Sequence, residues 1–94
     1  MQAEGMDRHQ LVAALRAFGV SDRVYGVNTR DLKSFVYIPE SVPVLGEGLD
    51  GRWYVAVYER GEQWVEASFD TEAEGCAYLY DTVTRRWAAR PSQD

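Results

Sequence analysis

Few residues of this 94-residue chain could carry out covalent chemistry. His9 is its only histidine and Cys76 its only cysteine. No cysteine or carboxylate lies near His9 at the spacing of metal ligands, so we expect an exposed helix residue there. Cys76 falls on the apolar stripe of a predicted helix, where a buried thiol is inert. The sequence therefore predicts no catalytic residue, no metal site and no enzyme activity.

Three glycines, Gly46, Gly48 and Gly51, have the G-x-G-x-x-G spacing of a dinucleotide-binding loop. Such a loop needs a strand before it and a helix after it. Here a predicted strand follows, and Pro43 precedes the first glycine. We therefore interpret the segment as an ordinary loop and expect no cofactor.

The clearest candidate for function is a surface on the stretch WYVAVYERGEQWVEASF, residues 53–69, which reads as a β-hairpin. Tyr and Trp flanked by charged residues are typical of the strongest contacts in protein interfaces. The predicted partner-binding residues are those of one hairpin face and two acids of the adjoining loop: Tyr54, Tyr58, Glu62, Trp64, Glu66, Glu47 and Asp50.

This assignment depends on the register of the hairpin. A three-residue loop, residues 59–61, with Gly61 left-handed sets Tyr58 opposite Glu62. It gathers the aliphatic side chains on the other face, with Val55 opposite Val65 and Trp53 opposite Ala67. A one-residue change of register exchanges the two faces.

The alternative is a two-residue loop, residues 60–61, which sets Val57 against Trp64. It requires a positive φ at Arg60, which is unfavourable for a side chain of this size. We therefore favour the three-residue loop. Two arrangements of the sheet stay open: the aromatic face is exposed to a partner, or one helix covers each face and these rings are core.

Helices are expected at both ends of the chain. Residues 8–18 have apolar side chains at helical spacing, an N-cap at Asp7 with Gln10 at the capping-box position, and a terminating Gly19. The last helix starts at Thr71 and Glu74, another capping box, and Gly75 suggests close packing. Its predicted buried stripe is Ala73, Cys76, Ala77, Tyr80, Val83 and Trp87.

The segments between these helices predict strands and one long loop. Residues 23–28 could form a short strand, and residues 35–38, FVYI, have strand-forming side chains. Residues 39–51 are rich in proline and glycine and are expected to form a loop. The fold class is therefore α+β: a short N-terminal helix, a small antiparallel sheet with a long hairpin, and a C-terminal helix.

Composition indicates one globular domain over residues 1–94, because 46% of the residues are hydrophobic and 27% charged. Its ends, residues 1–6 and 89–94, are expected to be loose. The net charge of −5 argues against a nucleic-acid partner. It would suit a basic protein partner, but on charge alone we favour the simpler interpretation that the acidic residues keep the protein soluble. No apolar run is long enough for a membrane span, and no signal peptide is evident, so we expect a cytoplasmic protein.

The segments WYVAVYERG, residues 53–61, and FDTEAEGCAYLY, residues 69–80, resemble a family of small bacterial immunity proteins from polymorphic toxin systems. Tyr25 and Asn28 match a Y-x-x-N segment of that family. The resemblance covers residues 11–80, with Gly75 in place of an alanine and a longer, glycine-rich loop before the hairpin. It implies a protein that binds a cognate toxin domain in the cytoplasm and neutralises it.

An adaptor that binds peptides along an exposed sheet edge is the alternative function. An exposed edge could also pair with a copy of itself, so both a monomer and a homodimer are compatible with the sequence.

Overall fold

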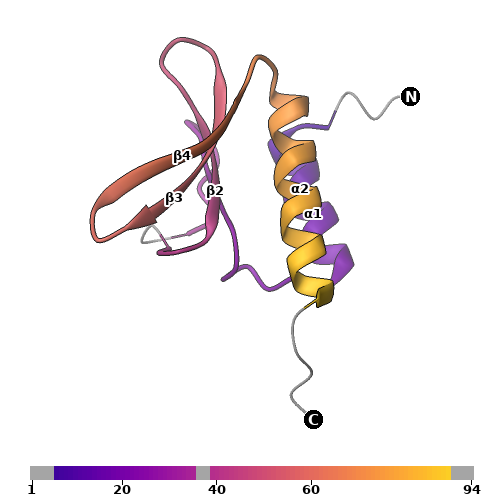
Figure 1. The fold of residues 1–94 in the computed structure, drawn as a ribbon. Helices are drawn as coiled ribbons and strands as arrows, with labels where there is room; N and C mark the ends of the chain where they lie inside the picture. The colour runs from indigo at the N-terminus through magenta and orange to yellow at the C-terminus, as the bar shows by residue number, and fades with distance from the viewer. Residues whose placement is uncertain (1–5, 36–38, 90–94) are drawn as a thin grey trace.

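The computed structural model describes residues 6–35 and 39–89. Its elements are, in chain order, α1 (Arg8–Phe18), β1 (Gly26–Asn28), β2 (Pro43–Glu47), β3 (Trp53–Glu59), β4 (Glu62–Phe69) and α2 (Glu72–Ala89). The strands form a sheet in the order β1-β2-β3-β4, and both helices lie on the same face of it (Figure 1). The predicted α+β class is confirmed. The sheet is mixed rather than wholly antiparallel, because β1 runs parallel to β2.

The first helix has the predicted bounds and caps. The Asp7 carboxylate accepts from the Gln10 backbone N–H at 2.8 Å, and the Gln10 side chain accepts from the Asp7 N–H at 2.9 Å. Gly19 ends the helix with a φ of 98°. Leu11 and Leu15 are fully buried. These local signals set where α1 begins and ends, and the packing of its buried face sets where it lies.

The prediction of a loop over residues 39–51 is wrong for its central part, because β2 is an interior strand with Val44 and Leu45 fully buried. Pro43 is tolerated as the first residue of the strand. The ring of Tyr54 lies over Gly46, its cross-strand partner, where a Cβ would be 2.3 Å from the ring. A glycine is therefore required inside this strand, although it reads as a loop signal.

The predicted first strand is confirmed in its second half, as β1. Of the predicted strand over residues 35–38, residues 36–38 lie outside the described residues, and Phe35 is not in a strand. The Phe35 ring packs over Gly26 and beside Val44 instead. Of the ends predicted to be loose, Met6 packs against the core and Ala89 is the last residue of α2; the others lie outside the described residues.

The β3–β4 hairpin has a two-residue turn, so the predicted three-residue loop is wrong. Arg60 and Gly61 both have positive φ, 53° and 82°, as a type I′ turn requires. Glu59 consequently opposes Glu62, and Tyr58 opposes Gln63 rather than Glu62. The backbone twist of this turn matches the twist of the strands, and the fit offsets the cost of a left-handed Arg60.

A β-bulge then changes the register between Val55 and Ala56 on β3, where Glu66 is the extra residue of β4. Beyond it, Val55 opposes Ala67 and Trp53 opposes Phe69, in place of the predicted Val65 and Ala67. The two faces of the hairpin therefore carry different residues from those predicted.

The core lies between the helices and one face of the sheet. A row of apolar side chains crosses this face, from Val27 through Leu45 and Val55 to Ala67. Gly75 lets α2 approach closely, because a Cβ there would lie 2.9 Å from the Leu45 side chain. The close packing that the sequence predicts at Gly75 is confirmed.

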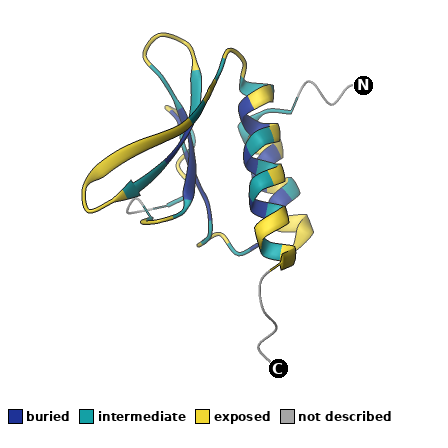
Figure 2. Ribbon diagram, in the orientation of Figure 1, coloured by how far each residue is buried: buried dark blue, intermediate teal, exposed yellow. Residues whose placement is uncertain are grey.

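The buried stripe of α2 is rotated from the predicted one. It consists of Gly75, Cys76, Leu79 and Val83, and Ala77 is exposed (Figure 2). The contact at Gly75 orients the helix, so Leu79, one turn later, faces the sheet. Ala73, Tyr80 and Trp87 are only partly buried.

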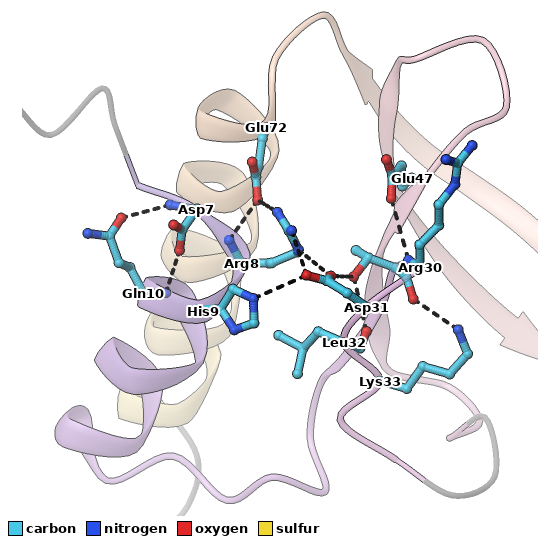
Figure 3. A network of polar contacts seen from close by, with 11 residues as sticks. Asp7, Arg8, His9, Gln10, Arg30, Asp31, Leu32, Lys33, Glu47 and Glu72 are labelled. Carbon is cyan, nitrogen blue, oxygen red and sulfur yellow. Dashed lines mark hydrogen bonds and ion pairs between the residues drawn. The ribbon is translucent and has the colours of Figure 1, made fainter.

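A polar network joins both helices to the loop after β1 (Figure 3). The Arg8 guanidinium donates to both Asp31 carboxylate oxygens, at 2.7 and 2.8 Å. It also donates to Glu72 Oε2 at 2.7 Å, and the Arg8 backbone N–H donates to the same oxygen at 2.8 Å. Arg8 holds the pKa of Asp31 well below its usual range. The network therefore fixes the start of α1 against the start of α2.

Replacing Arg8 with methionine should lower the free energy of unfolding by about 1 to 2 kcal/mol, because charged hydrogen bonds are strong but partial exposure screens them. Since the pKa of Asp31 is lowered in the folded protein, its contribution is present above the unfolded pKa and is lost as the pH falls. The difference between wild type and Arg8→Met should thus shrink from about pH 5 to about pH 2.

Urea unfolding followed by circular dichroism would measure this. Arg85→Met is the matched control, since it removes the exposed i,i+4 pair with Asp81 and should cost less than about 0.5 kcal/mol. A constant difference between wild type and Arg8→Met across this pH range would show that the network does not stabilise the fold electrostatically.

Candidate binding surface at the hairpin tip

The structure does not bring the predicted partner-binding residues together on one face. Tyr54 and Tyr58 lie on the outer face of the sheet, away from the helices. Tyr54 pairs with Ser68 of β4, and Tyr58 pairs with Gln63. Glu62 and Trp64 oppose Glu59 and Val57, which belong to the other face. The predicted grouping is therefore wrong, because it followed from the three-residue loop.

Tyr54 and Tyr58 are half-buried on a face that no helix covers. The Tyr58 hydroxyl accepts from Gln63 Nε2 at 2.8 Å. Burial and the neighbouring Tyr54 raise the pKa of Tyr58. A hollow of about 510 Å³ opens beside Tyr54, between Val65 and the fully exposed Leu49. This face offers apolar area, but the two rings also have a structural role over Gly46 and Gln63.

The other predicted acids lie apart from this face. The Glu66 carboxylate accepts from the Tyr78 hydroxyl, which ties the bulge to α2. Asp50 accepts from the Arg52 backbone N–H at 3.0 Å. Glu47 pairs with Trp53, at the opposite end of β3 from Glu59, so about 20 Å of strand separates it from Glu62. Glu47 and Asp50 therefore do not belong to the same surface as Trp64.

The exposed part of the hairpin is the start of β4. Residues 62–66 are all exposed, and Trp64 and Val65 retain 59% and 53% of their accessible surface. Figure 2 shows this stretch extending away from the helices. Because consecutive strand residues point to opposite faces, this stretch presents one large apolar side chain on each side of the hairpin.

A hollow of about 550 Å³ lies at the tip of the hairpin. Its walls come from the turn, from the start of β4 and from the segment before β2: Glu40, Ser41, Glu59, Arg60, Glu62 and Trp64. The Ser41 backbone N–H donates to the Tyr58 carbonyl at 2.9 Å, and the Ser41 hydroxyl donates to Glu59 at 2.9 Å. These bonds hold Glu40 next to the hairpin. We call these six residues the tip hollow.

Sequence reasoning missed Glu40 and Glu59 as members of this surface. Glu40 reaches it only because residues 40–41 fold back onto β3, a contact with no local signal. Glu59 faces Glu62 because the turn has two residues. The RG dipeptide was a signal that pointed to this turn, but the unfavourable φ of Arg60 counted against it.

The backbone at the tip hollow is strained. Among the described residues, Ser41 and Arg60 are the non-glycine residues with positive φ, 65° and 53°, and both line the tip hollow. A left-handed backbone costs a residue with a side chain roughly 1 to 2 kcal/mol. Strain of this kind clusters at functional sites, so its location here agrees with the exposed Trp64.

The residues that could have done chemistry are arranged as structural groups. Cys76 is fully buried, and burial raises the pKa of its thiol to about 12. His9 is exposed, with Nε2 3.5 Å from the Asp31 carboxylate. Within residues 6–35 and 39–89, no group of three His, Cys, Asp or Glu side chains could hold a metal ion. Neither described helix is apolar over the length that a membrane crossing needs.

The two residues of the Y-x-x-N segment also have structural positions. Tyr25 is fully buried, and its hydroxyl donates to Asp22 at 3.1 Å. Asn28 ends β1 and forms a bridge with Lys33. Both therefore position the segment that leads to β2.

Comparisons with known proteins identify no relative: no family model, no curated protein and no solved structure matches this chain.

Replacing Arg60 with asparagine should stabilise the protein by about 0.5 to 1.5 kcal/mol, because asparagine adopts the left-handed region at lower cost and Asn-Gly is a preferred type I′ turn. Urea unfolding at about 0.5 M salt, which screens the change of charge, would measure the gain. Arg30→Asn is the control, since Arg30 is exposed and has no left-handed φ. Equal effects of the two substitutions would contradict the strained turn.

Proposed function

We propose that this protein is an immunity protein that binds a cognate bacterial toxin domain in the cytoplasm of the producing cell and neutralises it. The proposal combines the family resemblance of the hairpin and the last helix with a surface suited to binding. The exposed side chains at the start of β4 offer a partner an interface.

The observation that carries the proposal is the exposure of Trp64 in the first half of β4, where residues 62–66 are all exposed. Trp64 and the adjacent Val65 are each more than half exposed. Tryptophan is enriched among residues that dominate binding energy, and such residues are surrounded by a polar rim. Glu62, Glu59 and Glu40 supply that rim around the tip hollow.

The charge of the chain supports a basic partner. Fifteen acidic residues exceed ten basic ones, which gives the net charge of −5. Opposite charges raise the rate of association, which suits an inhibitor that must capture a toxin before it acts. A toxin that cleaves nucleic acid would have a basic active site, and carboxylates at the tip hollow could occupy it in place of phosphates.

The first experiment is gentle purification of the tagged protein from its native host, followed by mass spectrometry of what is retained. We expect one stoichiometric partner, the C-terminal domain of a large secreted protein. Expression of that domain alone should then stop growth, and co-expression of this protein should restore it. Several substoichiometric partners, or no rescue of growth, would contradict the proposal and favour the adaptor function.

Trp64→Ala should weaken binding to the captured toxin domain by about 2 kcal/mol or more, as truncation of a central interface residue does. The fold should be unaffected, since Trp64 is 59% exposed and its neighbours in residues 62–66 are exposed too. Calorimetry would measure the affinity, and a thermal melt the stability.

Phe18→Ala is the matched control, because Phe18 is also an exposed aromatic residue, at 47%, but lies at the end of α1. Its affinity should stay that of the wild type. An unchanged affinity for Trp64→Ala would exclude the hairpin tip as the binding surface, and a loss of its folded structure would contradict the position described for Trp64.

A further inference from the structure

β4 forms an edge of the sheet made by the described strands. An antiparallel pair uses the backbone groups of alternate residues, so every second residue of β4 directs its N–H and C=O away from β3. These groups are a template for another strand. Over residues 62–65 the side chains on both faces are exposed, so a neighbouring strand would meet no obstruction from the described helices.

The bulge limits this template to a short stretch. Glu66 is the extra residue of the bulge, and its carboxylate is held by Tyr78 of α2. Bulges and charged side chains are the usual means by which proteins protect an edge from unspecific pairing. Residues 62–65 are therefore the regular part of the edge, between the turn and the bulge.

Charge determines which strand could pair there. Glu59 and Glu62 are directly opposite each other, and like charges in this position destabilise a hairpin. Glu40 lines the same tip hollow, and Arg60 is its one cationic residue. The six residues of the tip hollow thus combine three carboxylates with one guanidinium, and a cation from a partner would add a counter-charge. Trp64 adds an aromatic surface that attracts cations.

The same argument disfavours a second copy of this chain on the edge. Two copies of β4 placed side by side would bring Glu62 and Glu66 of one near those of the other. Each chain has a net charge of −5, so this contact would add to the repulsion. A basic strand would experience the opposite effect.

We propose that residues 62–65 of β4 accept an extended, basic segment of a partner protein as a fifth strand, with a Lys or Arg side chain in the tip hollow against Trp64 and Glu62. This inference rests on the proposed function, under which the partner protein is the toxin domain.

The alternation of side chains specifies the segment further. Partner residues opposite Glu62 and Trp64 point to the tip hollow, and these are the basic positions. The residue opposite Val65 points to the outer face, where Val65 ends an apolar row that starts at Val44 and passes through Ala56. An apolar residue is expected there. The bound segment therefore alternates between basic and apolar residues.

Synthetic peptides test the inference without the toxin. The probe is a capped Lys-Val-Lys-Val-Lys peptide, titrated into the full-length, isotope-labelled protein and followed by NMR. Saturable shifts should concentrate at residues 62–65. The charge-reversed Glu-Val-Glu-Val-Glu peptide should bind about tenfold more weakly or worse. A Lys-Val-Lys-Val-Lys peptide with N-methylated amides should also bind about tenfold more weakly than the unmodified peptide, because it cannot form the backbone hydrogen bonds of a strand.

Glu62→Gln should weaken the basic peptide about threefold or more without loss of thermal stability, since it also removes the repulsion from Glu59. Asp81→Asn, which removes one charge on the exposed side of α2, is the matched control and should bind as the wild type does. Three results would each overturn the inference: no binding of the basic peptide, equal binding of the N-methylated peptide, or shifts at another surface.

The peptide titration tests the strand-accepting edge, and the purification from the host tests the immunity function, so either proposal can be refuted without the other. Peptide binding at residues 62–65 without a toxin partner in the host would refute the immunity function and retain the strand-accepting edge. A toxin partner whose complex leaves the amides of residues 62–65 unprotected from hydrogen exchange would retain the immunity function and refute the edge.

Discussion

The β-bulge at Glu66 is the constraint on which the arrangement of this small protein depends. After the two-residue turn, an uninterrupted register would place Ala67 and Phe69 on the outer face. The extra residue returns both to the face that packs on α2, where Phe69 joins the core and lies against Tyr78. One residue of β4 thus reconciles a tight turn at the tip with a continuous core at the base, and the Tyr78 hydroxyl fixes it in place.

The bulge also divides the hairpin into two parts with different roles. Below it, Trp53, Val55 and Phe69 contact the core, and their positions are set by the helices. Above it, residues 62–65 have no such support, so their side chains are not needed to hold α2. Selection for stability alone would favour polar residues at Trp64 and Val65 and an Asn-Gly turn. The residues actually present fit a surface selected for something other than the stability of the free chain.

The sequence predicted the elements whose signals are local and missed those that tertiary contacts determine. The caps at Asp7, Gln10 and Gly19 define α1 because they act within a turn of the helix they terminate. The sequence alone does not reveal β2, because proline and glycine ordinarily indicate a loop. Both fit the strand here: Pro43 is its first residue, and Gly46 leaves room for the Tyr54 ring of the neighbouring strand. The predicted register of the hairpin is wrong for the same reason: the favourable twist of the whole hairpin outweighs the preference of Arg60 for a negative φ. The sequence identifies several candidate binding residues of the hairpin, but it places them on one face. Their division between two faces follows from the observed register: Tyr54 and Tyr58 on one face, Glu62 and Trp64 on the other.

The remaining question is why an acidic tip persists in a protein of this size. The Arg8 network shows what the chain does with carboxylates that have a structural role: Asp31 and Glu72 share one guanidinium, and the pKa of Asp31 falls accordingly. At the tip, Glu59 and Glu62 instead face each other across the strands, and Ser41 donates a neutral hydroxyl bond to Glu59. The two clusters therefore differ in kind. The first is completed within the chain, whereas the second combines like charges, left-handed backbone at Ser41 and Arg60, and an exposed tryptophan. The basic partner proposed above would offset the repulsion between the carboxylates and cover the tryptophan, while the backbone strain would stay as the cost of holding the tip in this shape.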